Sequence, residues 1–141
     1  AVRTEADIDY EKRFRNTDFH LYHYNDAMSH GACALAIDTK VSAIVVCTLS
    51  GDMARQVSRF RCPKPIIGMT TKRKVWNQLS LFWNVRPAMS EQFPTVDVLL
   101  YHARKVAKKS GLVKIGDRII ITAGITNGTS GNTDLIKMEE I

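Results

Sequence analysis

The hydrophobic positions of this chain fall into short strand-like runs that alternate with helical stripes. From Ala43 to Cys47 every residue is apolar and most are β-branched, as in a strand that is covered on both faces. Ser50 and Gly51 follow, and they provide a hydroxyl group and a residue that is free to bend. The next segment, up to about Phe60, carries an apolar stripe at helical spacing. This stretch therefore predicts a buried strand that turns directly into a helix.

The same alternation continues along the chain. Further strands are expected at 66–69, 85–89, 118–123 and 135–141, and further helices at about 25–38, 70–82 and 95–111. Asn25 and Thr95 are the predicted N-caps of two helices, Gly111 is the predicted end of the last one, and Pro87 is expected to shorten its strand. Because the final strand follows a loop without an intervening helix, we expect it to run antiparallel to its neighbour.

This order of elements predicts the fold class. Strands that alternate with helices form parallel sheets with right-handed crossovers. We predict a three-layer α/β sandwich, with a mostly parallel five-stranded sheet, helices on both faces and an antiparallel C-terminal edge strand. The first eighteen residues are polar, with Tyr10 and Phe14 as isolated apolar anchors. We expect residues 1–18 to be an extended connector and residues 19–141 to be the domain, cut from something longer because no Met opens the chain.

Composition narrows the class of protein. The chain has 45% hydrophobic and 24% charged residues, as ordinary soluble proteins do. No apolar run approaches the roughly 20 residues that cross a bilayer, so no membrane partner is expected. The three cysteines Cys33, Cys47 and Cys62 show no C-x-x-C spacing, which indicates reduced thiols with packing roles and a cytoplasmic location. The net charge of +6 is scattered and not interleaved with aromatic residues, so nucleic acid is not an expected partner.

Two segments rich in glycine and hydroxyl groups follow the carboxyl ends of predicted strands, at 48–51 and 124–132. The carboxyl ends of parallel strands lie on one edge of a sheet, so both segments can face one pocket. Backbone N–H groups and hydroxyls suit the oxygens of a phosphate, so we predict a site for a phosphorylated small molecule. The structural alternative, a plain turn with Ser and Gly, remains open. His20, His23 and His30 lack a nearby carboxylate or Cys in sequence and give little support to a zinc site.

Several blocks of the sequence resemble a known family. These blocks are 43–51, 59–71, 78–81, 85–87, 116–124 and 130–134. In colinear order they are similar to the C-terminal α/β domain of pyruvate kinase, and residues 3–10 look like the segment that leads out of its catalytic barrel. The resemblance implies a parent enzyme that transfers phosphate from phosphoenolpyruvate to ADP with magnesium and potassium. Its active site is built by a barrel and a lid domain, which these residues do not include. We therefore expect no catalytic residue, no metal and no cofactor in this chain, and no activity from it alone.

The resemblance also implies two roles for such a domain. One is to bind an allosteric effector, a sugar phosphate or a nucleotide. The other is to join the subunits of a tetramer, and we expect the C-terminal edge strand to form that contact. The family's effector loops match Thr48, Ser50 and Gly51 in the first segment and Gly124, Gly128, Thr129, Ser130 and Gly131 in the second.

The first loop departs from the family pattern. Where sugar-bisphosphate sites carry further hydroxyls or a basic residue, this chain has Leu49, Asp52 and Met53. A carboxylate in the first turn of a helix satisfies the helix dipole and repels an incoming phosphate. The alternative function is a stand-alone phosphometabolite-binding protein with the same fold.

Overall fold

A single mixed sheet organises the molecule. The computed structural model describes residues 8–123 and 135–141. Its strands are β1 (Ala43–Cys47), β2 (Ile66–Thr70), β3 (Val85–Met89), β4 (Arg118–Ala123) and β5 (Leu135–Glu140). They lie in the order β3-β2-β1-β4-β5, with parallel pairing throughout except between β4 and β5, which is antiparallel. The predicted five-stranded sheet and its antiparallel C-terminal edge strand are confirmed.

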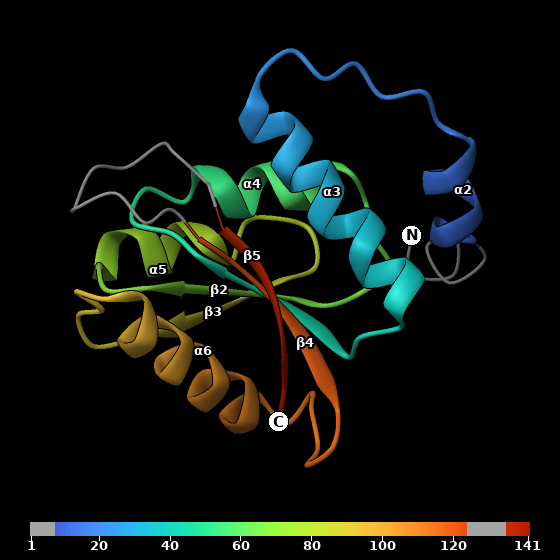
Figure 1. Ribbon diagram of the computed structural model, residues 1–141. Coiled ribbons are helices and arrows are strands. Elements are labelled where there is room, and N and C mark those ends of the chain that lie inside the picture. The colour runs from blue at the N-terminus through green and yellow to red at the C-terminus, as the bar shows by residue number, and fades with distance from the viewer. Residues whose placement is uncertain (1–7, 124–134) are drawn as a thin grey trace.

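Helices cover both faces of this sheet (Figure 1). On one face lie α3 (Tyr24–Thr39), α4 (Asp52–Arg59) and α5 (Arg73–Leu79), and on the other lies α6 (Val96–Ser110). The side chains of the central strand alternate between them, since Ile44 and Val46 pack in the first layer and Val45 packs with α6. Because β1 is covered on both faces, all five of its residues are buried, which explains its continuous apolar run. The predicted three-layer α/β sandwich is confirmed.

The edges of the sheet accommodate residues that a central strand would not. Pro87 lies in the outer strand β3, opposite Gly68 of β2, and β3 keeps its full expected length. A proline lacks only the N–H, which an edge strand can leave unpaired on its outer side. The expectation that Pro87 shortens the strand was therefore wrong.

The predicted ends of α6 are confirmed, but the predicted start of α3 is not. In α6 the Thr95 hydroxyl accepts a hydrogen bond from the Val98 N–H at 3.3 Å, and Gly111 ends the helix with φ of 76°, as predicted. Asn25 is not the N-cap of α3, which begins at Tyr24. The carboxylate of Asp26 instead accepts hydrogen bonds from the backbone N–H groups of the two residues before the helix, at 3.2 and 3.3 Å.

The predicted extended connector contains a helix, α2 (Tyr10–Asn16), so that part of the prediction was wrong. The Asp9 carboxylate accepts from the Lys12 N–H at 3.0 Å, which caps the helix. Only one residue of α2, Phe14, is buried, and a single buried position leaves no hydrophobic period in the sequence. The sequence signal for this helix is therefore limited to one buried aromatic side chain and the capping residue.

Candidate functional site

The predicted phosphate turn joins β1 to α4. Gly51 stands at the N-cap of α4 with φ of 88°, a left-handed conformation that a residue with a side chain adopts at a cost. Its N–H donates to the Thr48 hydroxyl oxygen at 2.8 Å. The Asp52 N–H donates to the Ser50 hydroxyl oxygen at 3.2 Å. The three predicted residues Thr48, Ser50 and Gly51 are therefore held together in one compact turn.

The hydroxyl groups of this turn keep donating capacity. A hydroxyl carries one hydrogen and two acceptor lone pairs, so Thr48 and Ser50 can accept from the backbone and still donate to a bound oxygen. Thr48 is 5% exposed and Ser50 is half-buried. An oxygen-rich ligand would reach Ser50 first and would have to come close to the chain to reach Thr48.

The charges at the turn nearly cancel. Asp52 opens α4, is exposed, and forms an ion pair with Arg55 one turn later, at 3.7 Å. The sequence analysis identified the carboxylate of Asp52 but not its pairing with the guanidinium of Arg55. The spacing of three residues on one helix was the available signal, because such pairs lie on the same face.

The end of β4 lies beside the turn. Cys47 and Ala123 are register partners in the parallel pair β1–β4, so both strands end at the same edge of the sheet. The second predicted loop therefore starts next to the first. Its candidate residues Gly124, Gly128, Thr129, Ser130 and Gly131 lie outside the described residues.

Two further buried threonines line this edge. The Thr70 hydroxyl oxygen at the end of β2 accepts from the Lys72 N–H at 3.3 Å, two residues later, as the Ser50 hydroxyl oxygen accepts from the Asp52 N–H. Thr122 of β4 is fully buried, and within the described residues its hydroxyl has no hydrogen-bond partner. Neither was among the predicted site residues. Thr70 was predicted to start the next helix but is the last residue of β2, and Thr122 lies inside an apolar run, where a threonine looks like an ordinary strand residue.

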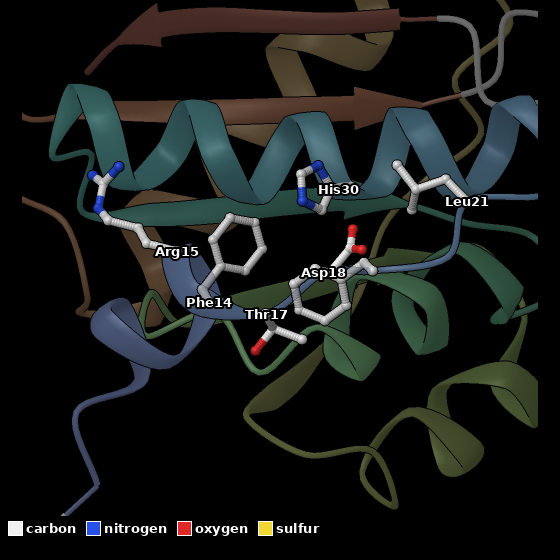
Figure 2. A pocket seen from close by; sticks show the side chains of 7 residues that line it. Phe14, Arg15, Thr17, Asp18, Leu21 and His30 are labelled. Carbon is white, nitrogen blue, oxygen red and sulfur yellow. The ribbon is translucent and has the colours of Figure 1, made fainter.

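A hollow of about 490 Å³ lies away from this turn, between α2, the segment after it and α3 (Figure 2). Phe14 stacks on His30 with ring centroids 4.9 Å apart, and Phe19 packs against both rings. Arg15 points away from these rings toward the C-terminal part of α3, where its guanidinium pairs with Asp38 at 2.9 Å (Figure 2). The aromatic side chains around the hollow thus attach α2 to α3, and the guanidinium of Arg15 is already paired with the carboxylate of Asp38.

The histidines are dispersed. His30 sits among aromatic rings, and burial lowers its pKa. His20 stacks on Tyr22 with centroids 6.1 Å apart, and His23 precedes α3. Within the described ranges, no group of three or more His, Cys, Asp or Glu side chains is arranged to hold a metal ion. Nor does any helix in the described ranges combine the length and apolar character needed to cross a membrane.

Comparison with known proteins gives one consistent result. The sequence profile of the family described as "Pyruvate kinase, alpha/beta domain" matches residues 26–139. The chain is 34% identical to a pyruvate kinase of Clostridium acetobutylicum, an alignment that covers 83% of this chain and 25% of that protein. It is 36% identical to a pyruvate kinase of Staphylococcus epidermidis, over 98% of this chain and 24% of that protein. For a pyruvate kinase of Lactobacillus delbrueckii subsp. bulgaricus the identity is 32%, over 99% and 24%. The chain thus spans about a quarter of the length of these relatives.

Proposed function

The chain belongs to the pyruvate kinase alpha/beta domain family, and on that premise we propose that it is the regulatory and oligomerisation domain of a pyruvate kinase. The observation that carries this proposal is the match over residues 26–139, which includes the whole β1–α4 turn. Its partners are the catalytic barrel and lid of the same enzyme, in the cytoplasm. Residues 1–18 connect it to that barrel, and residues 19–141 form the domain.

The chain alone does not catalyse phosphoryl transfer. That reaction needs cations held around the transferring phosphate by carboxylate ligands. By the resemblance to pyruvate kinase, the magnesium and potassium ions would be held in the catalytic barrel and lid. A coupled assay that follows pyruvate formation from phosphoenolpyruvate and ADP should give no signal with this polypeptide. Pyruvate production above the enzyme-free rate would contradict the proposal.

The β1–α4 turn binds the phosphate group of an effector, a sugar phosphate or a nucleotide. The Thr48 and Ser50 hydroxyls supply donors, and Gly51 lets the backbone bend so that α4 points its N-terminus at the ligand. Residues Gly124, Gly128, Thr129, Ser130 and Gly131 would complete the site from the neighbouring strand end. Asp52 opposes binding in two ways, because it repels the phosphate and pairs with the guanidinium of Arg55.

Calorimetric titration tests this site. Fructose bisphosphate, ribose phosphate and AMP are titrated into the chain and into its Asp52→Ser variant. The substitution removes the repulsion and frees Arg55, so we expect binding of the effector to tighten about two- to five-fold, the factor given by roughly 0.3–1 kcal/mol at an exposed helix end. The matched control is Asp97→Ser, which removes an acidic residue from the first turn of α6. Absence of heat for all three ligands with both forms would mean that the turn is a structural one only.

The outer edge of β5 joins two subunits across a two-fold axis. β5 is an edge strand of the sheet, and an unpaired edge tends to be covered or paired. An antiparallel pair centred on Met138 would set Lys137 of one copy opposite Glu139 of the other. These two side chains already pair within the strand at 3.5 Å, so the charges of the two copies match.

Mass in solution tests this contact. Sedimentation at increasing concentration should show self-association, and Lys137→Glu should weaken it by placing a carboxylate opposite Glu139. The double variant Lys137→Glu with Glu139→Lys restores the charge match and should restore association. Lys74→Glu controls for net charge, because Lys74 lies in α5, which packs on β2 and β3 at the opposite edge of the sheet. A strictly monomeric chain at high concentration would count against the proposed edge.

A stand-alone phosphometabolite-binding protein with this fold remains the second candidate. The same turn supports it, because a phosphate site does not by itself require a catalytic barrel. The length of the encoding reading frame separates the two: a frame that encodes a barrel before residue 1 supports the pyruvate kinase domain, and a frame that encodes this domain alone supports the second candidate.

A further inference from the structure

The hollow between α2, the segment that follows it and α3 has the size of a small-molecule site (Figure 2). Its volume of about 490 Å³ lies within the range of about 300–1,000 Å³ that is usual for ligand pockets. The sequence did not predict it, because α2 and α3 meet only in the folded chain. No residue of the β1–α4 turn lines it, so a ligand bound here would be distinct from the proposed effector.

Aromatic rings form one wall of the hollow. The rings of Phe14 and His30 stack with their centroids 4.9 Å apart and their planes at 22°. Phe19 lies 5.4 Å from both of these rings, and its plane is inclined at 64° to that of His30. Leu21 adds an aliphatic side chain that is 40% exposed. Such a wall offers apolar contact and the electron-rich faces of aromatic rings, which attract a cation.

Three polar side chains at the hollow can accept a hydrogen bond from a ligand. The Asp18 carboxylate is turned toward α3 (Figure 2), and no ion pair or hydrogen bond within residues 8–123 and 135–141 engages it. Thr17 donates its hydroxyl hydrogen to the carbonyl oxygen of Arg13 at 2.5 Å, so its oxygen keeps only acceptor lone pairs. Burial lowers the pKa of His30, so its ring is neutral at pH 7 and one of its nitrogens is an acceptor.

The cationic side chain at the hollow is already neutralised. The guanidinium of Arg15 pairs with the carboxylate of Asp38 at 2.9 Å and with that of Glu11 at 3.4 Å. In Figure 2 Arg15 extends toward the C-terminal part of α3, away from Asp18. The charge that is left without a partner at the hollow is therefore the negative charge of Asp18.

We propose that this hollow binds an organic cation, namely a protonated amine carried on an aromatic or other apolar body. The ammonium group donates to the Asp18 carboxylate, and the Thr17 oxygen and a His30 ring nitrogen are further acceptors for its hydrogens. The apolar body packs against Phe19 and Leu21. A neutral ligand of the same shape gains no ion pair, and an anion is repelled by Asp18.

Three ring compounds that differ in charge test the proposal. Benzylamine, benzyl alcohol and benzoate are titrated into the whole chain at neutral pH and low salt, and the backbone amide signals are followed by nuclear magnetic resonance. We expect benzylamine to shift the signals of residues 14–21 and of His30. It should bind about five- to ten-fold tighter than benzyl alcohol, the factor that corresponds to one partly exposed charge-assisted hydrogen bond. Benzoate should cause no shift.

Variants separate the charge of the hollow from its apolar wall. Asp18→Asn keeps the shape of the side chain and removes its charge, so it should weaken benzylamine binding about five- to ten-fold and leave benzyl alcohol unchanged. Leu21→Ala should weaken both compounds by a similar factor, about two-fold, because it removes apolar contact from each. The matched control is Asp97→Asn, which removes an exposed carboxylate in α6 on the opposite face of the sheet and should change neither.

Four results would overturn the proposal. Benzylamine that shifts no signal would show that the hollow does not bind such a cation. Benzyl alcohol that binds as tightly as benzylamine would show that the hollow is only apolar. A preference for benzoate would mean that Arg15, and not Asp18, sets the charge of the hollow. Equal weakening by Asp18→Asn and Asp97→Asn would mean that benzylamine responds to the net charge of the chain.

Discussion

Replacing Phe14 by alanine tests whether α2 is part of the domain or a separable connector. The ring of Phe14 is 7% exposed and packs against His30 and Phe19, with centroids 4.9 and 5.4 Å away. A second aromatic contact joins Tyr10 of α2 to Trp83 at 4.9 Å. The Phe14 ring thus attaches the helix to α3, and the Tyr10 ring attaches it to the segment between α5 and β3.

The stabilisation lost in Phe14→Ala can be worked out from the burial of the Phe14 ring. A buried aromatic side chain removes about 150–250 Å² from water, which at about 25 cal/mol per Å² stabilises by about 4–6 kcal/mol. Ordering the backbone of seven residues costs about 7–14 kcal/mol. The Phe14 ring is therefore a large share of what keeps α2 in place. A helix of this length is not stable by itself in water, so Phe14→Ala should undock α2 and leave it unfolded.

Hydrogen exchange followed by mass spectrometry measures this. In Phe14→Ala the amides of residues 10–16 should exchange as in an unfolded peptide, while those of β1 and β4 keep their protection. The free energy of unfolding of the remaining domain, measured in urea, should fall by about 1–3 kcal/mol. This is less than for a residue in the central core, because only Phe19, His30 and their neighbours lose a contact. Phe93→Ala is the matched control, since Phe93 packs on the opposite face of the sheet and should leave α2 protected.

Two results would refute this reasoning. Wild-type protection of α2 in Phe14→Ala would mean that Tyr10 and the ion pairs of Arg15 hold the helix without the ring. Equal loss of protection in α2, β1 and β4 would mean that α2 is part of the cooperative unit, and the domain boundary at residues 18 and 19 would then be wrong.

Further predictions concern two glycines and one histidine. Gly68→Ala should lower the free energy of unfolding by about 1–3 kcal/mol in urea titration, because the added Cβ would lie 3.0 Å from a methyl of Leu79 and 3.2 Å from a methyl of Val85. An unchanged midpoint would show that these two side chains can move aside at no cost. Gly51→Ala should cost about 1–2 kcal/mol by the same measurement, since the backbone there has φ of 88° and the nearest side-chain atom to the added Cβ is at an ordinary 3.6 Å; a neutral effect would contradict the strain argument. Burial lowers the pKa of His30 in the folded state, so the unfolded chain binds a proton first as pH falls. The contribution of neutral His30 to the free energy of unfolding is therefore present above about pH 6.5 and is lost as pH falls from there to the folded-state pKa. Urea midpoints at pH 8, 6 and 5 should depend less on pH in His30→Gln than in the unchanged chain.

The sheet was predictable because its signals are local. The central strand Ala43–Cys47 is a continuous apolar run, and a strand that is covered on both faces is usually apolar along its whole length. Thr95 and Gly111 mark the ends of α6 by their own backbone chemistry. The helix α2 left no such period, since only one of its seven residues is buried. Its weaker signals were the N-cap Asp9 and the pairing of Glu11 with Arg15 four residues later.

The candidate site was predictable only in part. The β1–α4 turn has a sequence signature, because its glycine needs a left-handed backbone and its hydroxyls cap nearby N–H groups. What depends on the tertiary arrangement had no signature. Thr122 looks like an ordinary strand residue in the sequence, and only the folded sheet shows that its buried hydroxyl has no hydrogen-bond partner among residues 8–123 and 135–141.

The helix α3 contacts each of the parts to which a role has been proposed. Its His30 touches the connector helix α2 through Phe14, and the next residue, Gly31, leaves room for Ile136 of the proposed subunit edge, 3.9 Å from where a Cβ would lie. Three residues after His30, Cys33 lies against the backbone of α4, whose first residue follows the proposed effector turn. Packed helices move as rigid units and not residue by residue. If a ligand at the proposed effector turn displaced α4, we would expect α3 to shift as a whole, so that its contacts with α2 and with the proposed subunit edge would change together.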